Sequence, residues 1–174
     1  MEHFFFGTLR DRELLEIVLG RAVADEDMTP ATLPDHALKR VVEEGYPALV
    51  PRPGGSVEGV LVRGLDAGDI ARLEWFEGKE YVPAVVEVRR AGGGRAGDER
   101  AAALIQTPTD ALEIADADWH FARWRGKEKA RVVSLTRGHM ALFGKVGIDE
   151  AIRRWDEARE RLEAESGAPP SDEE

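Results

Sequence analysis

A predicted helix meets a predicted strand in the sequence Leu73-Glu74-Trp75-Phe76-Glu77-Gly78-Lys79-Glu80-Tyr81. The helix opens at Asp66, which is a good N-cap residue, and Gly78 ends it. At about 100° per residue, Glu77 falls within about 40° of Ile70 and Leu73 on the apolar face. Burial there raises the pKa of a carboxyl group toward neutrality, which suits a proton-transfer group. The alternative is a frayed last turn that leaves Glu77 in solvent.

A second decisive stretch, residues 6–9, follows the first predicted strand and reads Phe6-Gly7-Thr8-Leu9. The apolar run 4–6 predicts a short buried strand that stops at Gly7, and a helix is predicted between Asp11 and Gly20. A strand-to-helix turn leaves backbone N–H groups free to converge on a carboxylate or an oxyanion. The other interpretation of these four residues is an ordinary turn with a tolerant glycine.

The rest of the chain predicts an α+β fold. Strands come mostly in runs, which favours a mixed sheet of about six strands over regular βαβ winding. Further strands are predicted at 37–43, 48–50, 57–62, 81–89 and 101–106. Apolar residues occur on both faces of the strand over 57–62, so we expect both of its faces to be covered. A turn is predicted at 51–55, where proline and glycine cluster, and the tip of a hairpin at 91–98. Helical segments are predicted at 116–125, 136–142 and 148–162, the last with an apolar stripe that we expect to pack on the sheet. A dimer contact is the alternative for that stripe, and residues 167–174 are predicted to be disordered.

Composition limits the classes of function. The 174 residues carry a net charge of -10, which disfavours nucleic acid and anionic membrane surfaces as partners. A small acidic metabolite stays compatible, because backbone amides can bind an anion on an acidic protein. The absence of cysteine excludes disulfides and thiolate chemistry, and the four histidines lack metal-ligand spacing, so we predict no metal and no cofactor. With neither a leader nor an apolar span in view, a cytoplasmic location is expected.

Four motifs in this order resemble the gamma-glutamylcyclotransferase-like (AIG2-like) family, over about residues 3 to 107. The first is similar to the family's YGTLR opening and the last to its LDxFEG…Y element, which holds the catalytic glutamate. The motifs are Phe6-Gly7-Thr8-Leu9-Arg10, Tyr46-Pro47-Ala48-Leu49-Val50-Pro51, Val57-Glu58-Gly59-Val60-Leu61, and Leu73-Glu74-Trp75-Phe76-Glu77-Gly78 with Tyr81.

The resemblance implies a barrel-like α+β roll that cyclises a γ-glutamyl amine or peptide to 5-oxoproline. It implies Glu77 as the general acid/base, backbone groups of Phe6, Gly7, Thr8 and Leu9 as the holders of the glutamyl group, and Tyr81 as a wall of the pocket. Ring closure needs no external nucleophile, because the substrate's own amine attacks its γ-carbonyl. The expected partner is therefore a small γ-glutamyl substrate, and the expected assembly is a monomer or a weak homodimer.

Three positions depart from the family pattern: Phe6 replaces a tyrosine, Glu74 an aspartate, and Pro83 an arginine common in relatives. The changes at 6 and 83 motivate a second hypothesis, a non-catalytic binding or regulatory module that keeps the pocket. Hydrolysis or repair of another small amide is a third. We expect residues 1–110 to form the catalytic core, 111–166 a helical extension packed on it, and 167–174 a tail.

Overall fold

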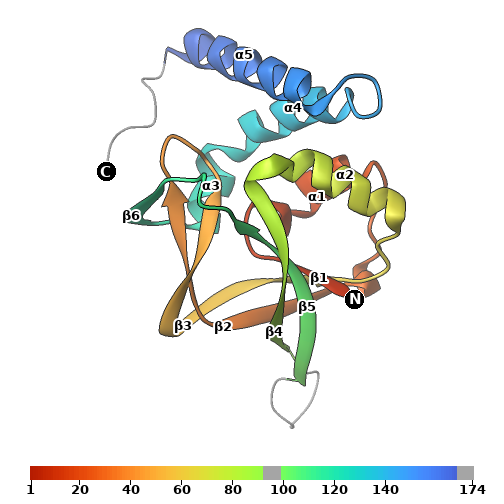
Figure 1. The fold of residues 1–174 in the computed structure, drawn as a ribbon, viewed down its shortest axis with the longest axis vertical. Coiled ribbons are helices and arrows are strands. Elements are labelled where there is room, and N and C mark those ends of the chain that lie inside the picture. The colour runs from red at the N-terminus through yellow and green to blue at the C-terminus, as the bar shows by residue number, and fades with distance from the viewer. Residues whose placement is uncertain (92–98, 168–174) are drawn as a thin grey trace.

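Five strands of this chain close into a barrel, and a sixth strand extends it at one edge (Figure 1). The computed structural model describes residues 1–91 and 99–167. The strands are β1 (Glu2–Phe5), β2 (Met28–Val41), β3 (Pro47–Val62), β4 (Tyr81–Arg90), β5 (Glu99–Pro108) and β6 (Ile114–Asp118). They pair in the order β3-β1-β5-β4-β2, the ring closes because β2 also pairs with β3, and β6 adds to β2. The β1–β5 pair is parallel and the other pairs are antiparallel, so the predicted mixed α+β sheet is confirmed.

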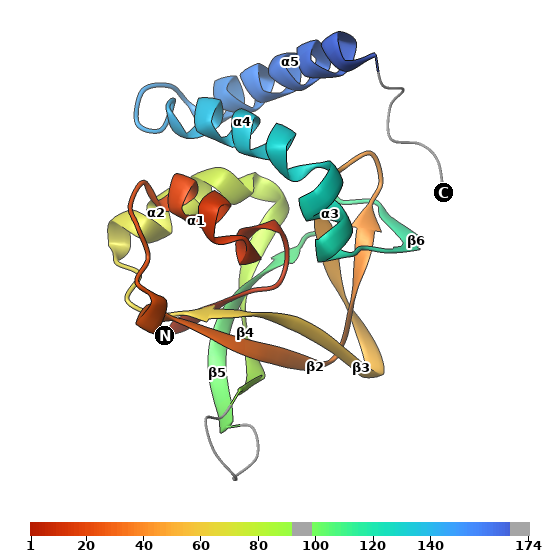
Figure 2. The same cartoon turned by 180° about the vertical axis from the view of Figure 1, so that it is seen from behind.

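Helices gather against one end of the barrel, with the C-terminal helix outermost (Figures 1 and 2). They are α1 (Arg12–Leu19), α2 (Ala67–Glu77), α3 (Phe121–Lys127), α4 (Lys129–Met140) and α5 (Ile148–Ser166), with short 3-10 turns at Thr8–Arg10, Asp25–Asp27 and Gly78–Glu80. The predicted caps of the first helix are confirmed. The Asp11 carboxylate accepts a hydrogen bond from the Leu14 amide at 3.2 Å, and Gly20 ends α1 with a φ of 71°.

Residues 51–55, predicted as a turn, lie within the long strand β3 instead. The register between β2 and β3 passes from Pro34 opposite Ser56 to His36 opposite Pro51, so residues 52–55 face Asp35 alone. Asp35 adopts a left-handed φ of 58°, and its carboxylate accepts a hydrogen bond from the Gly54 amide at 2.8 Å. The proline and glycine residues therefore make an irregular bulge in a continuous ladder, and pairing on either side keeps the strand extended.

Two further predictions about elements were wrong. Strand β2 begins at Met28 rather than at residue 37, and residues 116–118 belong to strand β6 rather than to a helix. The pairing partner decides both, since β2 pairs along β3, and Lys39 of β2 lies opposite Asp118 of β6. Helix α5, which was expected to pack on the sheet, packs mainly on α4 instead. The predicted tail and most of the predicted hairpin tip, residues 168–174 and 92–98, lie outside the described residues.

The strand over 57–62 is covered on both faces, as its pattern predicted. Val60 and Val62 pack into a core shared with the helices, whereas Val57 and Leu61 pack into the core inside the barrel. Gly59 lies where the two layers approach most closely. A Cβ atom at this position would lie 2.5 Å from the Phe4 ring and from the Phe5 carbonyl oxygen, so no larger residue fits.

Candidate active site

A cavity of about 400 Å³ lies where the end of α2, the turn after β1 and the start of β4 meet. Every residue predicted for the site lines this cavity. They are Phe6, Gly7, Thr8, Leu9, Glu77 and Tyr81. The fold thus brings together two segments about seventy positions apart in the sequence, because β1 and β4 both pair with β5.

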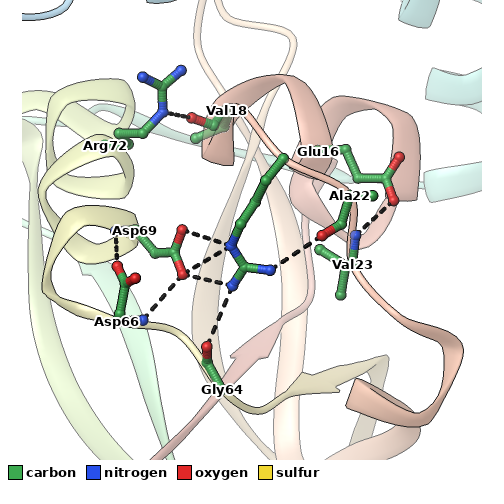
Figure 3. A network of polar contacts seen from close by, with 9 residues as sticks. Glu16, Val18, Ala22, Val23, Gly64, Asp66, Asp69 and Arg72 are labelled. Atoms are coloured by element: carbon green, nitrogen blue, oxygen red, sulfur yellow. Dashed lines mark hydrogen bonds and ion pairs between the residues drawn. The ribbon is translucent and has the colours of Figure 1, made fainter.

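Helix α2 is anchored at its first turn by Asp66 and Asp69 (Figure 3), and Glu77 is the last residue of the same helix. The Asp66 carboxylate accepts a hydrogen bond from the Asp69 amide at 2.9 Å, and the Asp69 carboxylate accepts one from the Asp66 amide at 3.0 Å, which completes a capping box. The buried Asp69 carboxylate also accepts from the Arg21 guanidinium, with an Nη2–Oδ2 distance of 2.6 Å and an Nε–Oδ1 distance of 3.0 Å. Arg21 holds the pKa of Asp69 below its usual range.

Glu77 carries the electrostatic signature of a proton-transfer group. Burial raises its pKa from 4.5 to about 7. No charged group or hydrogen bond among the described residues contributes to this shift. The side chain lies at the C-terminus of α2, where the carbonyl groups of the last turn also disfavour a negative charge. Glu77 therefore exchanges a proton readily near neutral pH.

The turn at Gly7 lines the same cavity. Gly7 caps the 3-10 turn, its carbonyl oxygen accepts from the Arg10 amide at 3.1 Å, and that of Thr8 accepts from the Asp11 amide at 3.0 Å. The amides at the start of such a turn have no acceptor within it. A Cβ atom on Gly7 would lie only 3.0 Å from the Pro47 ring, so the small residue lets the turn approach strand β3 closely.

Two tyrosines form the wall beside Glu77. The Tyr81 hydroxyl donates to the Pro47 carbonyl oxygen at 3.4 Å, and its ring meets that of Tyr46 edge-on at 5.9 Å between centroids. Burial, assisted by Tyr46, Glu77 and other nearby acids, raises the pKa of Tyr81, so its hydroxyl stays protonated. Tyr81 therefore lines the cavity together with Glu77, with its ring packed against that of Tyr46.

Several lining residues were not identified from the sequence. They are Glu44 and Tyr46 in the β2–β3 connection, Glu80 after α2, His139 on α4, and Ile152, Trp155, Asp156 and Arg159 on α5. The α5 residues lie at helical spacing on one face. The sequence showed this face as the apolar stripe of the helix predicted at 148–162, which was expected to pack on the sheet. The apolar stripe of α5 could be seen in the sequence, but the surface that it faces could not, because about forty residues of chain separate α5 from β5, the last strand of the barrel.

The Trp75–His139–Trp155 stack connects α5 to the helix of Glu77. The imidazole of His139 lies 5.5 Å from both indole rings, measured between centroids. Its Nε2 lies 3.3 Å from the Trp75 carbonyl oxygen, and the Trp75 indole donates to the His139 carbonyl oxygen at 3.4 Å. Burial lowers the pKa of His139, so the ring is neutral and packs as an aromatic. The last turn of α2 is thereby fixed against α4 and α5.

Among residues 1–91 and 99–167, no group of three or more histidine, aspartate or glutamate side chains is arranged to hold a metal ion. None of the helices described combines the length and the apolar character that a bilayer span requires.

A closed five-stranded barrel, capped by helices and hollowed beside one buried acid, defines an α+β barrel protein with a cavity of small-molecule size. The family model described as "Gamma-glutamyl cyclotransferase, AIG2-like" matches residues 3–121. The chain belongs to this family, and the match extends past the four motifs to include β6.

Relatives agree with this assignment, and solved structures share the fold. AIG2-like protein B of Arabidopsis thaliana is 30% identical over 87 residues, which are 50% of this chain and 49% of that protein, so the match spans about half the relative's length. AIG2-like protein C of the same plant is 25% identical over 139 residues, covering 77% of this chain and 74% of that one. The fold resembles a solution structure from Arabidopsis thaliana, with a TM-score of 0.55 at 23% identity over 84% of this chain and 94% of that chain. It also resembles a structure described as gamma-glutamyl cyclotransferase, with a TM-score of 0.50 at 17% identity over 65% and 68% of the two chains.

Proposed function

We propose that this protein cyclises a γ-glutamyl amine or peptide to 5-oxoproline and releases the amine, with Glu77 as the general acid/base. The observation that supports this most directly is a carboxyl group of pKa about 7 in the same cavity as the Gly7 turn. Family membership supports the same class of reaction. The cavity volume of about 400 Å³ suits a substrate of dipeptide size.

In the proposed reaction, ionised Glu77 takes a proton from the substrate's α-ammonium group. The freed amine attacks the γ-carbonyl carbon, forming the C–N bond of a five-membered lactam and a tetrahedral oxyanion. Collapse of this intermediate breaks the bond to the original amide nitrogen, to which protonated Glu77 returns a proton. The attacking nitrogen sheds two protons in all and the departing amine gains two, so no proton is consumed. A pKa near 7 suits a group that acts in both directions.

The Gly7 turn and Tyr81 have supporting roles in this proposal. Amides of the segment from Phe6 to Leu9 would hold the glutamyl group and stabilise the developing negative charge, because such donors are already oriented before the charge forms. The Thr8 side chain lines the cavity and adds a hydroxyl donor. Tyr81, held by the Pro47 carbonyl oxygen, would keep the substrate against Glu77.

The direct test is to incubate the purified protein with a panel of γ-glutamyl compounds and to measure 5-oxoproline. Glu77→Gln should lower kcat on the order of 10²- to 10⁴-fold, since it removes the proton shuttle. Glu74→Gln is the matched control, because it removes an exposed carboxylate one turn earlier on the same helix and should leave kcat unchanged. Turnover that persists unchanged in Glu77→Gln protein would remove Glu77 from this role.

The pH dependence of activity gives an independent check. The free enzyme must hold Glu77 ionised to accept a proton, so kcat/KM should fall about tenfold per pH unit below a pH of about 7. The profile should be measured on one substrate in buffers of constant ionic strength. A limb with its midpoint near pH 4.5, the ordinary value for glutamate, would show that burial does not tune this group.

The alternative function is a binding or regulatory module that keeps the cavity without turnover. The observation that favours it is Phe6, which lines the cavity with a ring that has no hydroxyl. Thermal stabilisation by a γ-glutamyl compound that is never converted to 5-oxoproline would select this alternative over the enzyme.

A further inference from the structure

Charged side chains from three separate segments meet at one end of the cavity. They come from the β2–β3 connection, the turn after α2, and helix α5. We refer to Glu44, Tyr46, Glu80, Asp156 and Arg159 as the outer subsite. Glu80 is exposed to solvent, whereas Glu77 is partly buried. The outer subsite is therefore the end of the cavity nearer to solvent. Tyr81 adjoins the outer subsite, since its ring meets that of Tyr46 edge-on at 5.9 Å between centroids, and it lines the cavity together with Glu77.

The outer subsite is fixed in place. The Trp119 indole donates to the Gly45 carbonyl oxygen at 2.9 Å, which holds the connection that carries Glu44 and Tyr46. Arg159 spans from α5 to that connection, and its Nη1 lies 3.2 Å from Glu44 Oε2. The positions of these charges are thus set before any ligand binds, which favours selective recognition.

Negative charge exceeds positive charge in this subsite. Three carboxylates share one guanidinium, and Arg159 is already engaged on both sides, with Nη2 3.3 Å from Asp156 Oδ1 and Nη1 beside Glu44. The Glu80 carboxylate accepts a hydrogen bond from the Tyr46 hydroxyl at 3.4 Å and forms no salt bridge among the described residues. Lys79 also lines the cavity, but its ammonium group pairs with Asp149 at 3.0 Å.

Aromatic rings complete the surroundings. Tyr46 and Tyr81 meet edge-on, and the Trp155 indole lines the cavity from α5. Aromatic rings beside carboxylates attract an ammonium group by cation–π and Coulomb interactions together. A carboxylate would instead meet three like charges and an arginine without free capacity.

We propose that the outer subsite selects γ-glutamyl substrates whose leaving amine carries a second positive charge, such as a diamine, over those whose leaving group carries a carboxylate. Helix α5 supplies Asp156 and Arg159, so the C-terminal helix is a specificity element of the cavity. This inference rests on the proposed function, because it assigns the glutamyl group to the Glu77 end. The leaving amine then extends past Tyr81 into the outer subsite.

The test uses three γ-glutamyl amides that differ only in the terminal group of a four-carbon chain. The leaving amines are 1,4-diaminobutane, pentylamine and 5-aminopentanoate, which end in an ammonium, a methyl and a carboxylate group. On the full chain, kcat/KM should follow that order, with about tenfold between the first and the last. The difference should reside in KM, since the charge is remote from the reacting atoms, and added salt should reduce it.

Asp156→Asn probes the subsite directly, and Glu157→Gln is its control. The neighbouring Glu157 pairs with Arg153 at 2.6 Å on the exposed face of α5, so both variants lose one carboxylate from the same helix. Asp156→Asn should lower the ammonium-to-carboxylate ratio of kcat/KM about threefold or more, whereas Glu157→Gln should leave it unchanged. An equal effect of both variants would assign the preference to the overall charge of the protein and overturn the inference.

The possible failures are distinguishable. If all three amides yield 5-oxoproline at equal rates, or the carboxylate is preferred, the subsite inference is wrong and the proposed function stands. If other γ-glutamyl compounds of the panel yield 5-oxoproline and none of these three amides does, the subsite inference is wrong and the proposed function stands. If no compound of the panel yields 5-oxoproline, the proposed function is wrong, and calorimetric Kd values for the three amides test the subsite. Tightest binding of the ammonium compound would then support it, and equal or undetectable binding would overturn it.

Discussion

Glu77 is a carboxyl group placed where a folded protein ordinarily avoids one. It lies against the cavity at the end of α2, and burial raises its pKa without a cation or a hydrogen bond to offset the rise among the described residues. Asp69 is arranged differently, since its buried carboxylate accepts two hydrogen bonds from the Arg21 guanidinium. The contrast separates an acid that stabilises the fold from one that destabilises it, and buried groups of the second kind gather at functional sites.

The stability of the protein should therefore depend on the ionisation of Glu77. Because its pKa is higher in the folded state than in the unfolded state, its contribution is most favourable below pH 4.5 and is lost as pH rises through about 7. We expect Glu77→Gln to stabilise the fold at pH 8 by about 2 kcal/mol and by little at pH 4.5. Urea denaturation at both pH values measures this. A variant less stable than the parent at pH 8 would contradict the argument.

At the scale of elements, helix α2 is held at both ends and carries Glu77 at its C-terminus. Its first turn is tied to the loop after α1 by Arg21 and Asp69, and its last turn is held by the Trp75–His139–Trp155 stack. A helix fixed at both ends transmits little motion to the side chain at its C-terminus. The position of the acid is thus set by contacts far from it in sequence.

We expect Asp69→Ala to lower the free energy of unfolding by about 2 kcal/mol, because it removes a capping interaction and leaves Arg21 without its carboxylate. Urea denaturation at pH 7 measures the loss. Asp149→Ala is the control, since it removes the exposed partner of Lys79 and should change stability little. Similar losses in both variants would show that the anchor of α2 contributes no more than a surface ion pair.

At the scale of the whole molecule, residues far apart in sequence enclose one cavity. Arg159 on α5 meets Glu44 in the β2–β3 connection, 115 positions away. Burial raises the pKa of Glu44 and Arg159 opposes that rise, so the ionised pair depends on the arginine. The ion pair between Arg159 and Glu44 therefore helps to hold α5 against the cavity.

Arg159→Met should destabilise the protein by about 1 kcal/mol at pH 8, because it leaves a half-buried carboxylate without its cation. The deficit should shrink toward pH 4, since Glu44 then becomes protonated and no longer needs the arginine. The comparison is with Arg153→Met on the exposed face of the same helix, whose effect should be small at either pH. Urea midpoints for both variants at pH 4 and pH 8 measure this, and a deficit independent of pH would assign the loss to packing.

Local signals were enough for the parts of the fold and site that depend on neighbours in sequence. The caps of α1 and α2, the two-sided burial of 57–62 and the inward orientation of Glu77 follow from patterns that span a few residues. Local patterns did not predict strand β6, the bulge within β3 or the start of β2. Each of these depends on pairing with a strand elsewhere in the chain.

By itself the sequence determined the family, the α+β class and the residues to examine around Glu77 and Gly7, since these depend on motifs and on helical periodicity. Only the tertiary structure decided that one cavity contains both segments, that burial tunes the acid, and that α5 closes the far end. The physical reason is that desolvation and enclosure are properties of everything packed around a group, and periodicity describes one element alone.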